Sequence, residues 1–509
     1  MRDVEAAARN GRALVVAPGT VVTPAARERA AELRVAIRVQ RDRLPPVAVP
    51  LPALREDYDL IEPLAAFVIA AAAQPLPEEI IDRTKLLLID SLAAGYSGIR
   101  NGQIRALAES LAARRHGERG HLIGLRQKLV PTDAALVNAS MIHAHGLDAR
   151  FDPGDVSPLP GPVAATLALA DELRLREPGA ILPAIAIGVE VGCRIAAAAT
   201  NRPSLSRTAA IAALGGTAAA AVLLDLELEA LIAAFGLALS QALLPVDEES
   251  SLGPLVAGFG AQAAVQAARL AAGGVVGPRQ VIEGPAGYAR LVERGQFNRT
   301  AALDGLGATW RLEDVRVQLY PVDRHAAAAV ESAVQLAGGR LAPERIQQLV
   351  IEASAAVVRA GAGKPGPAAP PAELRRSLPY LVARALRDGW IGLDSVEPSS
   401  APDPDLWELM ERIELSPSPE IPPDSETPVR LLVLTTEGIL LESTVDGMPG
   451  DLSNETTRER VLSKLADCWR VSGQPRYRRP LRLVDAVESL DLSQSLTAFW
   501  SAVSPQAAL

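Results

Sequence analysis

The stretch Asn138–Asp171, NASMIHAHGLDARFDPGDVSPLPGPVAATLALAD, organises the chain, because a polar segment passes through a turn-rich segment into an alanine-rich helix. Its clustered ionisable side chains are His143, His145, Asp148, Asp152 and Asp155. Four prolines accompany them, Pro153, Pro158, Pro160 and Pro162. We expect these prolines to hold the backbone out of a helix until Val163. Ionisable side chains on a loop held by a rigid element are typical of binding and catalytic sites, so we predict that the functional site lies here.

The composition is that of a globular protein with a large core. With 509 residues, 49% of them hydrophobic, the chain is expected to divide into two or three domains. A net charge of -9 and the lack of a basic block argue against a nucleic-acid-binding surface. The only cysteines, Cys193 and Cys468, are far apart and form no CxxC motif. Neither a disulfide framework nor a thiolate metal site is therefore expected, and the reducing cytoplasm is the expected compartment.

No membrane insertion or secretion is expected. A membrane helix needs about 20 apolar residues, whereas the apolar runs here are short, as residues 184–189 between Pro183 and Glu190 illustrate. The N-terminal sequence MRDVEAAARNGR lacks the basic region followed by an apolar run that marks a secretory signal.

Residues 1–57 are predicted to form an appendage on the main body. Leu14–Val16 is predicted to be a strand, Pro18 begins a turn, and a short helix capped by Thr23 follows. Arg34–Gln40 favours a second strand, and the prolines after it indicate a stiff linker. Two interpretations remain open: the appendage packs on its own subunit or a neighbouring one, or it docks a partner.

Residues 58–284 are predicted to form a large all-α domain, because apolar residues recur at helical spacing with Pro or Gly at the breaks. The first helices are expected at Glu62–Ala73, from Pro77 through Leu92, and at Asn101–Arg114. Small residues such as those at 215–222 allow close helix packing, so we interpret these stretches as buried surface.

Residues 285–450 are predicted to form a smaller α+β lid domain, which makes the expected fold class mostly α. Short β-rich runs are found at Arg311–Val317, Arg345–Ala353 and Val429–Leu434, and helices at Ala326–Leu336 and Leu378–Arg387. Residues 360–371 are rich in Gly and Pro, which indicates a mobile loop, and Thr435–Gly438 is predicted to be a hairpin turn. Residues 451–509 are expected to be helical again and to return to the first domain.

Several separated segments carry a resemblance to a known family. They are LPEEIIDRTKLLLIDSLAAGYSG at 76–98, DAALVNASMIHAHGLD at 133–148, LGGTAAAAVLLDL at 214–226, LVAGFGAQAAVQAARLAAGGVVGP and VIEGPAGY within 255–288, VQLYPVDRH at 317–325 and SLPYLVARALRDG at 377–389. Each segment is weak alone, but together they are specific. The chain resembles the MmgE/PrpD family, which includes 2-methylcitrate dehydratase and cis-aconitate decarboxylase, from about Leu60 to Leu465.

The resemblance implies a helical domain with an α+β lid, a homodimer, a substrate pocket between the two domains, and neither a metal nor an organic cofactor. It also implies proton abstraction next to a carboxylate, followed by loss of water or carbon dioxide from a small polycarboxylic acid. Such chemistry needs a base near the acidic carbon, an acid for the leaving group or carbanion, and cations that hold the carboxylates.

The chain departs from the family pattern in the central stretch. Where the family has HALDFDD, this chain has HAHGLDA at 143–149, which keeps the first histidine, His143, and one aspartate, Asp148. The leading aspartate of the family falls on Gly146 or, with a shift of one residue, on His145. The following His-Pro-Ser of the family falls near Asp155.

Other charged family positions are also replaced. A second histidine expected before the LGGTAAAA segment falls near Ser206, and the lysines of the LxAG and KxYP motifs fall on Gly253 and Gln318. The four lysines of the chain are elsewhere, at Lys85, Lys128, Lys364 and Lys464. Each lost charge-assisted hydrogen bond is worth roughly 1.5–3 kcal/mol. We therefore expect an acid-binding cleft that keeps its architecture while its positive charges have been lost.

Nine residues are singled out as candidates. The catalytic candidates are His143, His145, Asp148 and Asp155, and the substrate-binding candidates are Arg207, Gln318, Arg324, His325 and Tyr380. The alternatives are a core histidine bonded to a helix end, solvated loop residues, surface ion pairs for the arginines, and packing for the tyrosine. A metal site at the histidines is disfavoured, because no HExxH or comparable second half follows.

The favoured function is a divergent lyase or isomerase that acts on a small, less charged organic acid. In this hypothesis His143 or His145, with Asp148 or Asp155, transfers protons, and arginines clamp carboxylates, since arginine cannot act as an acid or base near neutral pH. The alternative is a catalytically inactive member that serves as a scaffold or partner subunit through its appendage. An arginine and histidines converging on a cleft would favour the enzyme.

Overall fold

The computed structural model describes residues 14–16, 29, 37–39 and 59–504, with gaps at 114–118, 174, 176–177, 201–205, 244–251, 339–342, 367, 398–403, 475–479 and 492–494. The chain divides into two compact units. The first holds residues 1–50 and 307–309, and the second holds the rest. Within the second unit, the predicted divisions at 58–284, 285–450 and 451–509 remain proposals.

In the first unit, β1 (Leu14–Val16) pairs in parallel with β2 (Ile37–Val39). Both strands lie where the sequence predicts them. Parallel neighbours need a crossover connection of a dozen or more residues, and residues 17–36 are long enough to provide one. The predicted turn at Pro18, the cap at Thr23 and the proline-rich linker lie outside the described residues.

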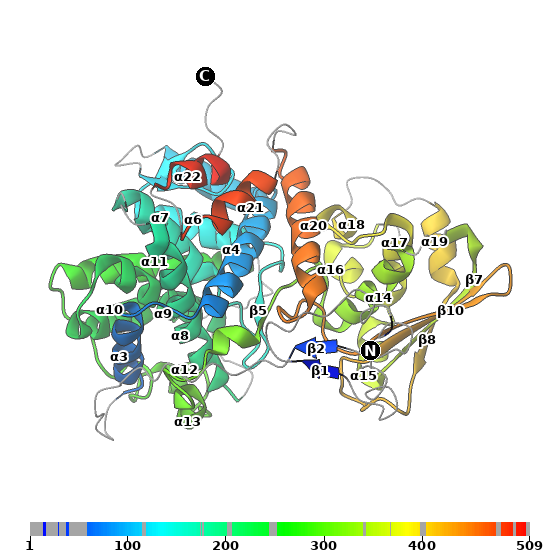
Figure 1. The fold of residues 1–509 in the computed structure, drawn as a ribbon, viewed down its shortest axis with the longest axis horizontal. Helices are drawn as coiled ribbons and strands as arrows, with labels where there is room; N and C mark the ends of the chain where they lie inside the picture. Colours follow the sequence, from blue (N-terminus) through cyan, green and yellow to red (C-terminus); the bar gives the residue numbers. More distant parts are fainter. Residues whose placement is uncertain are drawn as a thin grey trace. The chain divides into compact units, whose positions relative to one another are not determined.

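A layer of packed helices occupies residues 61–272 of the second unit (Figure 1). These helices are α3 (Ile61–Ala72), α4 (Glu78–Gly98), α5 (Gly102–Ala112), α6 (Pro131–His143), α7 (Pro160–Glu172), α8 (Ile181–Ala197), α9 (Arg207–Leu224), α10 (Leu228–Ala242) and α11 (Gly253–Ala272). The predicted helices at 62–73, 77–92 and 101–114 are confirmed as α3, α4 and α5. Helix α9 packs against α7, α8 and α11, and α11 also packs against α6.

Small residues let these helices approach each other closely. A Cβ atom on Gly161 of α7 would lie within 3.0 Å of the backbone oxygen of Ala212 in α9. A Cβ atom on Gly258 of α11 would meet Ser140 of α6 equally closely. The interpretation of the alanine- and glycine-rich stretches as buried packing surface therefore agrees with the contacts, and the site described below stands on rigid helices.

Two stretches, 178–197 and 207–224, are long and apolar enough to cross a membrane by length and composition alone. In each stretch, 83% of the apolar window is buried inside the protein, which is how core helices of a helical bundle behave. The expectation that all apolar runs are short is therefore wrong. Many residues in these runs are alanine or glycine. Their small side chains allow neighbouring helices to surround each run closely.

The smaller part contains a four-stranded mixed sheet in the order β10-β9-β7-β8. Its strands are β7 (Ile346–Ala353), β8 (Ile413–Pro417), β9 (Val429–Thr435) and β10 (Leu440–Val445). β7 and β8 are parallel, and the other pairs are antiparallel. The predicted hairpin turn at 435–438 joins β9 to β10, where Gly438 adopts a φ of 77°.

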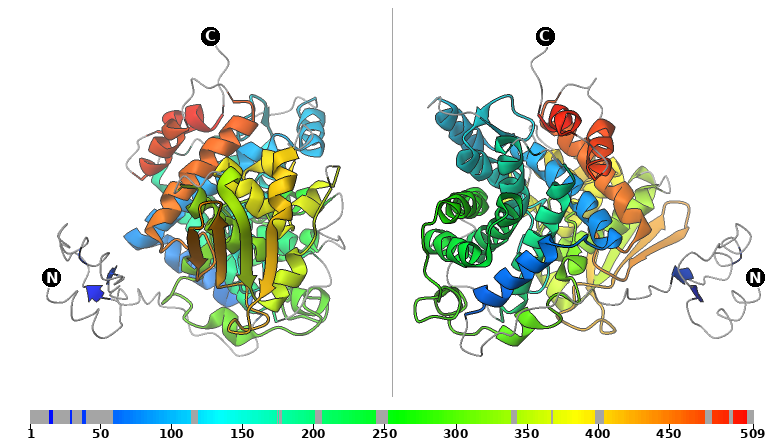
Figure 2. Two further views of the ribbon diagram at one scale, coloured as in Figure 1. Left: turned by 90° about the vertical axis from the view of Figure 1, so that its right-hand side faces the viewer. Right: turned by 60° about the vertical axis from the view of Figure 1, so that its left-hand side comes forward.

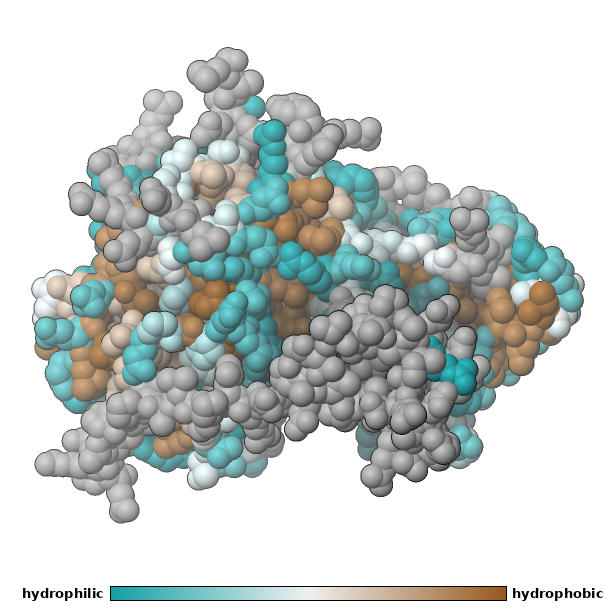
Figure 3. All heavy atoms as spheres, in the orientation of Figure 1, coloured by the Kyte–Doolittle hydropathy of each residue, from teal (hydrophilic) through white to brown (hydrophobic). Residues whose placement is uncertain are grey.

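Helices cover one face of this sheet (Figure 2, left). They include α14 (Ala327–Gly338), which packs against β9 and β10, and α17 (Leu378–Asp388), which packs against α14 and α19 (Pro404–Glu411). Shorter helices in the same part of the chain are α15 (Ala355–Gly361), α16 (Pro371–Leu374) and α18 (Leu393–Val396). Two other short helices are α12 (Tyr288–Leu291) and α13 (Arg299–Leu303), of which α13 packs against α8. At the far end of the sheet, Figure 3 shows a group of apolar residues, and Leu440, the first residue of β10, is 66% exposed.

The C-terminal helices are α20 (Glu455–Val471), α21 (Leu481–Glu488) and α22 (Thr497–Val503). Helix α20 packs along α4 and also contacts α18, so it lies between the helical part and the sheet-bearing part (Figure 1). The fold-class prediction is confirmed: the chain is mostly helical, with a small mixed sheet in its C-terminal region. The expected strand at Arg311–Val317 is largely a 3-10 turn followed by the short β6 (Val315–Arg316).

Candidate active site

The loop between α6 and α7, residues 144–159, carries the candidate site. Gly146 adopts a φ of 64°, a conformation that glycine tolerates best, and this turns the chain directly after α6. β5 (Arg150–Phe151) then pairs antiparallel with β6. A segment more than 150 residues further along the chain thus fixes the middle of the loop.

Residues 151–156 form a tight hairpin in this loop. The N–H of Phe151 donates to the carbonyl of Val156 at 2.9 Å, and the N–H of Val156 donates back at 3.2 Å. At the turn, Gly154 has a φ of 82°, and its missing Cβ would lie within 3.0 Å of the backbone oxygen of Ala196 in α8. Only glycine fits there without moving the hairpin, so the hairpin is fixed on the helical layer.

Helix α7 begins at Pro160, earlier than the predicted start at Val163. Proline at the first position of a helix removes only an N–H that has no partner within the helix, so the prolines begin this helix instead of delaying it.

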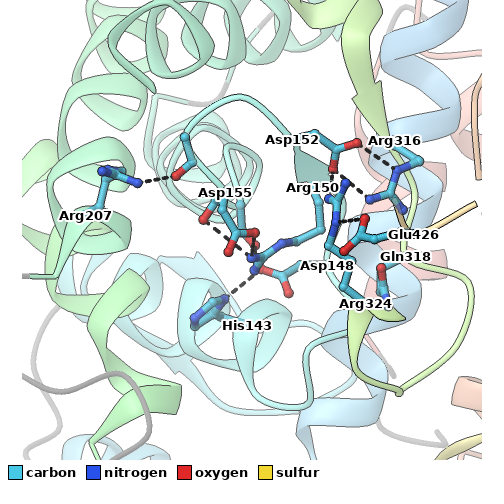
Figure 4. Close-up of polar contacts among 12 residues, drawn as sticks. His143, Asp148, Arg150, Asp152, Asp155, Arg207, Arg316, Gln318, Arg324 and Glu426 are labelled. Carbon is cyan, nitrogen blue, oxygen red and sulfur yellow. Dashed lines mark hydrogen bonds and ion pairs between the residues drawn. The ribbon is translucent and has the colours of Figure 1, made fainter. Parts of the chain in front are cut away.

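His143, the last residue of α6, pairs with Asp148 of the loop. Nδ1 of His143 lies 2.7 Å from Oδ2 of Asp148, whose side chain is fully buried, and the histidine is 12% exposed (Figure 4). Burial alone would raise the pKa of Asp148, but His143 and Arg150 hold it below its ordinary value. The charged carboxylate therefore accepts Nδ1–H and fixes the tautomer, which assigns proton acceptance to Nε2.

His145 belongs to a second cluster, with two residues that the sequence analysis did not select. Its Nδ1 lies 3.2 Å from Oε1 of Glu397, and the same oxygen accepts a hydrogen bond of 2.6 Å from Nη2 of Arg375. Arg375 also donates to the backbone oxygen of His145 at 3.0 Å. Burial would raise the pKa of Glu397, but His145 and Arg375 hold it below its ordinary value. This cluster ties the loop to the sheet-bearing part.

Asp152 lies between two arginines of the later chain. Nη2 of Arg316 lies 2.7 Å from Oδ1 of Asp152, and Nη1 of Arg324 pairs with the same oxygen (Figure 4). Nε of Arg324 also pairs with Glu426. Burial would raise the pKa of Asp152, but the two arginines hold it below its ordinary value. Arg324, a predicted substrate contact, is thus brought to the loop, while Arg316 was missed although it stands two residues before the KxYP position.

Asp155 forms an ion pair within the loop, and Arg207 of α9 contacts the hairpin from outside. The exposed Asp155 pairs with Arg150 of the same hairpin. Nε and Nη2 of Arg207 lie 2.8 and 2.6 Å from the two carboxylate oxygens of the fully buried Glu293, and Nη1 donates to the backbone oxygen of Gly154. An organic acid would have to displace these partners to reach either guanidinium.

The remaining predicted substrate-binding residues are Gln318, His325 and Tyr380, and each lies within hydrogen-bonding distance of a backbone carbonyl. Nε2 of Gln318 donates to the carbonyls of Tyr320 and Val322 at 3.1 and 3.2 Å. Nε2 of His325 lies 2.9 Å from the carbonyl of Arg376, and the hydroxyl of Tyr380 donates to Ser395 at 2.6 Å. Burial raises the pKa of Tyr380. These contacts agree with the alternative of structural roles, and substrate binding by the three residues stays a prediction.

The expectation that positive charge has been lost around residues 143–155 is wrong. The segment itself carries Arg150, and cations from other positions contact it: Arg207, Arg316, Arg324, Arg375 and Lys464. Nζ of Lys464 donates to the carbonyl of Leu147 and lies 2.6 Å from Asp90, with both side chains buried. The sequence around Lys464 does not predict this role, because α20 is far from the loop along the chain and contacts it only in the folded protein.

No described group of three or more His, Cys, Asp or Glu side chains is arranged to hold a metal ion. His143 and His145 face different carboxylates, which separates the two residues that would begin such a site. The prediction that the chain needs no cofactor stays a prediction.

The fold and site together define a helical protein with a carboxylate-oriented histidine beside clustered arginines. Residues 62–300 match the MmgE/PrpD N-terminal domain, and residues 320–488 match the MmgE/PrpD C-terminal domain. The chain belongs to the MmgE/PrpD family, which confirms the resemblance drawn from the sequence.

Its characterised relatives are distant. Cis-aconitate decarboxylase from Aspergillus terreus is 25% identical over 265 residues, 49% of this chain, and the chain spans only 54% of that relative's length. The human cis-aconitate decarboxylase is 24% identical over 84% of this chain and 92% of its own length. The cis-aconitate decarboxylase-like protein oryM of Aspergillus oryzae is 24% identical over 84% of this chain and 94% of its own.

Proposed function

We propose that the chain is a lyase of this family that removes a proton next to a carboxylate of a small organic acid. The contact of 2.7 Å between His143 and the buried Asp148 carries this proposal, because it orients a general base at the end of α6. The relatives are named cis-aconitate decarboxylases, which supports a lyase that acts on a small carboxylic acid.

The pair performs the first step as follows. Asp148 stays ionised, holds Nδ1–H of His143 and stabilises the imidazolium that forms when Nε2 takes up the proton. A positioned general base of this kind contributes about 10²–10⁴ to the rate. His145 or Asp155 then supplies the second proton transfer, to the leaving group or the carbanion.

The nearby guanidinium groups suit the charge that develops on the acid. Proton loss next to a carboxylate builds enolate-like charge, which cations stabilise in place. Arg150, Arg316 and Arg324 lie on or beside the loop, but each already pairs with an internal carboxylate. A substrate with few negative charges therefore matches the site better than a trianion.

Deuterium uptake tests the proposal independently of the group that leaves. The purified protein is incubated in D₂O with cis-aconitate, 2-methylcitrate and other short di- and tricarboxylates, and exchange next to the carboxylate is followed by NMR. His143→Gln is expected to lower the exchange rate by about 10²–10⁴. His121→Gln is the matched control, because His121 stacks on Trp500 and faces Asp171 elsewhere in the helical part. Equal exchange by His143→Gln and the control would refute the assignment.

The second candidate is a catalytically inactive scaffold or partner subunit. The internal ion pairs of Arg150, Arg316 and Arg324 favour this inactive candidate, because a substrate carboxylate could bind these arginines only if an internal carboxylate moved away. A natively folded protein that exchanges deuterium with none of the acids would support this candidate. The homodimer is likewise a proposal from the family resemblance, and light scattering of the purified chain tests it.

A further inference from the structure

The side chain of Asp152 lies between two arginines, Arg316 and Arg324. Arg316 approaches one oxygen through Nη2 at 2.7 Å and the other through Nε at 3.4 Å, and Arg324 adds Nη1 (Figure 4). Guanidinium groups that converge on one carboxylate in this way are the usual protein device for holding an organic acid. Here the chain supplies the acid itself.

The arrangement is open to solvent on one side. The side chains of Asp152 and Arg324 are 35% and 39% exposed, whereas Arg316 is only 8% exposed and donates to the carbonyl of Pro449 at 3.3 Å. Arg316 is therefore the buried side of this arrangement, and Arg324 is the side that a solute can reach from solvent. A small acid can approach this clamp if Asp152 does not fill it.

The local charges are already balanced. Arg316 and Arg324 carry two positive charges, and Asp152 and Glu426 carry two negative charges. Asp152 remains charged near neutral pH, because the arginines hold its pKa below the ordinary value. A further carboxylate brought to this point would meet no uncompensated cation and would face the charge of Asp152 directly.

We propose that Asp152 is a built-in carboxylate in a clamp formed by Arg316 and Arg324, and that it restricts the chain to mono- and dicarboxylic acids by excluding the third carboxylate of a tricarboxylic acid. The proposal rests on the proposed function for the place of the acid, but it concerns binding and not turnover. Asp152 is thus a specificity residue, and the relatives' named substrate, cis-aconitate, is the acid it excludes.

Backbone pairing, and not the ion pairs, sets the position of Asp152. The N–H of Asp155 donates to the carbonyl of Asp152 at 3.0 Å within the hairpin. Arg150, two residues before Asp152, is paired with Arg316 through the β5–β6 ladder. Removing the carboxylate of Asp152 therefore leaves both the hairpin and the arginines in place.

Isothermal titration with a tricarboxylate and a dicarboxylate, cis-aconitate and succinate, tests the proposal. The unaltered chain is expected to bind succinate more tightly than cis-aconitate. Asp152→Ala is expected to raise the affinity for cis-aconitate at least tenfold relative to succinate, and Asp152→Ala combined with Arg324→Gln is expected to lose that gain. Asp152→Asn, which keeps the size and removes the charge, provides the same test if the alanine variant does not fold.

Asp394→Ala is the matched control, because Asp394 is likewise a partly exposed carboxylate paired with two arginines, Arg100 and Arg470, and belongs to neither the catalytic nor the binding candidates. An equal gain in Asp394→Ala would show a general charge effect and overturn the proposal, as would an unchanged preference in folded Asp152→Ala and Asp152→Asn. A His143→Gln variant that binds the acids but lacks deuterium exchange separates this outcome from a failure of the proposed function. Acid binding by the Asp152 variants without any exchange would support the clamp while the lyase proposal fails.

Discussion

Replacement of Lys464 by methionine is expected to destabilise the protein strongly, because it removes one partner of a buried ion pair. Nζ of Lys464 lies 2.6 Å from Oδ1 of Asp90, and the side chains are 1% and 0% exposed. Burial raises the pKa of Asp90 to about 6 even though Lys464 opposes this shift. At neutral pH the carboxylate is therefore charged and depends on Lys464.

The expected loss follows from two contacts. Breaking a buried ion pair by removal of one partner costs about 3–5 kcal/mol. The carbonyl of Leu147 also loses the ammonium as a donor, and an unsatisfied buried carbonyl costs about 1–3 kcal/mol. Methionine has nearly the volume of lysine, so a cavity adds little to this loss.

The loss depends on pH in a defined direction. Because the folded pKa of Asp90 lies above its ordinary value of 3.8, its ionisation lowers the free energy of unfolding as pH rises from 3.8 to about 6. Without Lys464 the pKa of Asp90 rises further, so the decline continues to higher pH. The deficit of Lys464→Met is therefore expected to be larger at about pH 8 than at about pH 5.

Urea unfolding at both pH values measures these differences. The control combines Asp90→Leu with Lys464→Met, since an apolar pair of similar volume is often as stable as a buried ion pair. The double variant is expected to recover most of the loss. The reasoning is refuted if Lys464→Met unfolds like the unaltered protein at both pH values, or if the double variant is no more stable than the single one.

Two further predictions concern the helical layer and the acid–base pair. Gly161→Ala places a Cβ against the backbone of Ala212 and should lower the free energy of unfolding by about 1–3 kcal/mol; Gly102→Ala, which meets nothing within 4 Å, should not destabilise the protein in the same urea titration. Asp148 contributes stability that is present above the ordinary aspartate pKa and lost as pH falls below it, because its folded pKa is lowered. Asp148→Asn should therefore show a flatter decline in acid; an unchanged acid profile contradicts the ionised pair.

The elements were predictable where the signal is local. Asn101 was placed at the start of a helix and caps α5, accepting from the N–H of Gln103 and Ile104. Ser377 caps α17, which begins at the predicted Leu378. β8 was missed, because Ile413–Pro417 has only one fully buried apolar residue and pairs with a distant strand. A short strand of this kind is stable only through its neighbours, so its own sequence carries little signal.

The site shows the same division between local and distant contacts. The pair of His143 and Asp148 lies within five positions of the chain, and the predicted loop contains both. Glu397 and Lys464 reach the loop from more than 200 residues away. Hydrophobic spacing says nothing about which charged residues meet across a fold, so the loop's own groups could be selected while most of its partners could not.

The absence of a side chain at Gly154 sets how far the hairpin can move. The backbone of Gly154 lies close to Ala196, and Arg207 donates a hydrogen bond to the carbonyl of Gly154. The turn therefore fixes the distance between α8 and the arginines that pair with Asp152. Admitting a bulkier acid, as distinct from a more highly charged one, would therefore require a longer turn. Exchanging residues within the present turn would alter its charge and leave its reach the same.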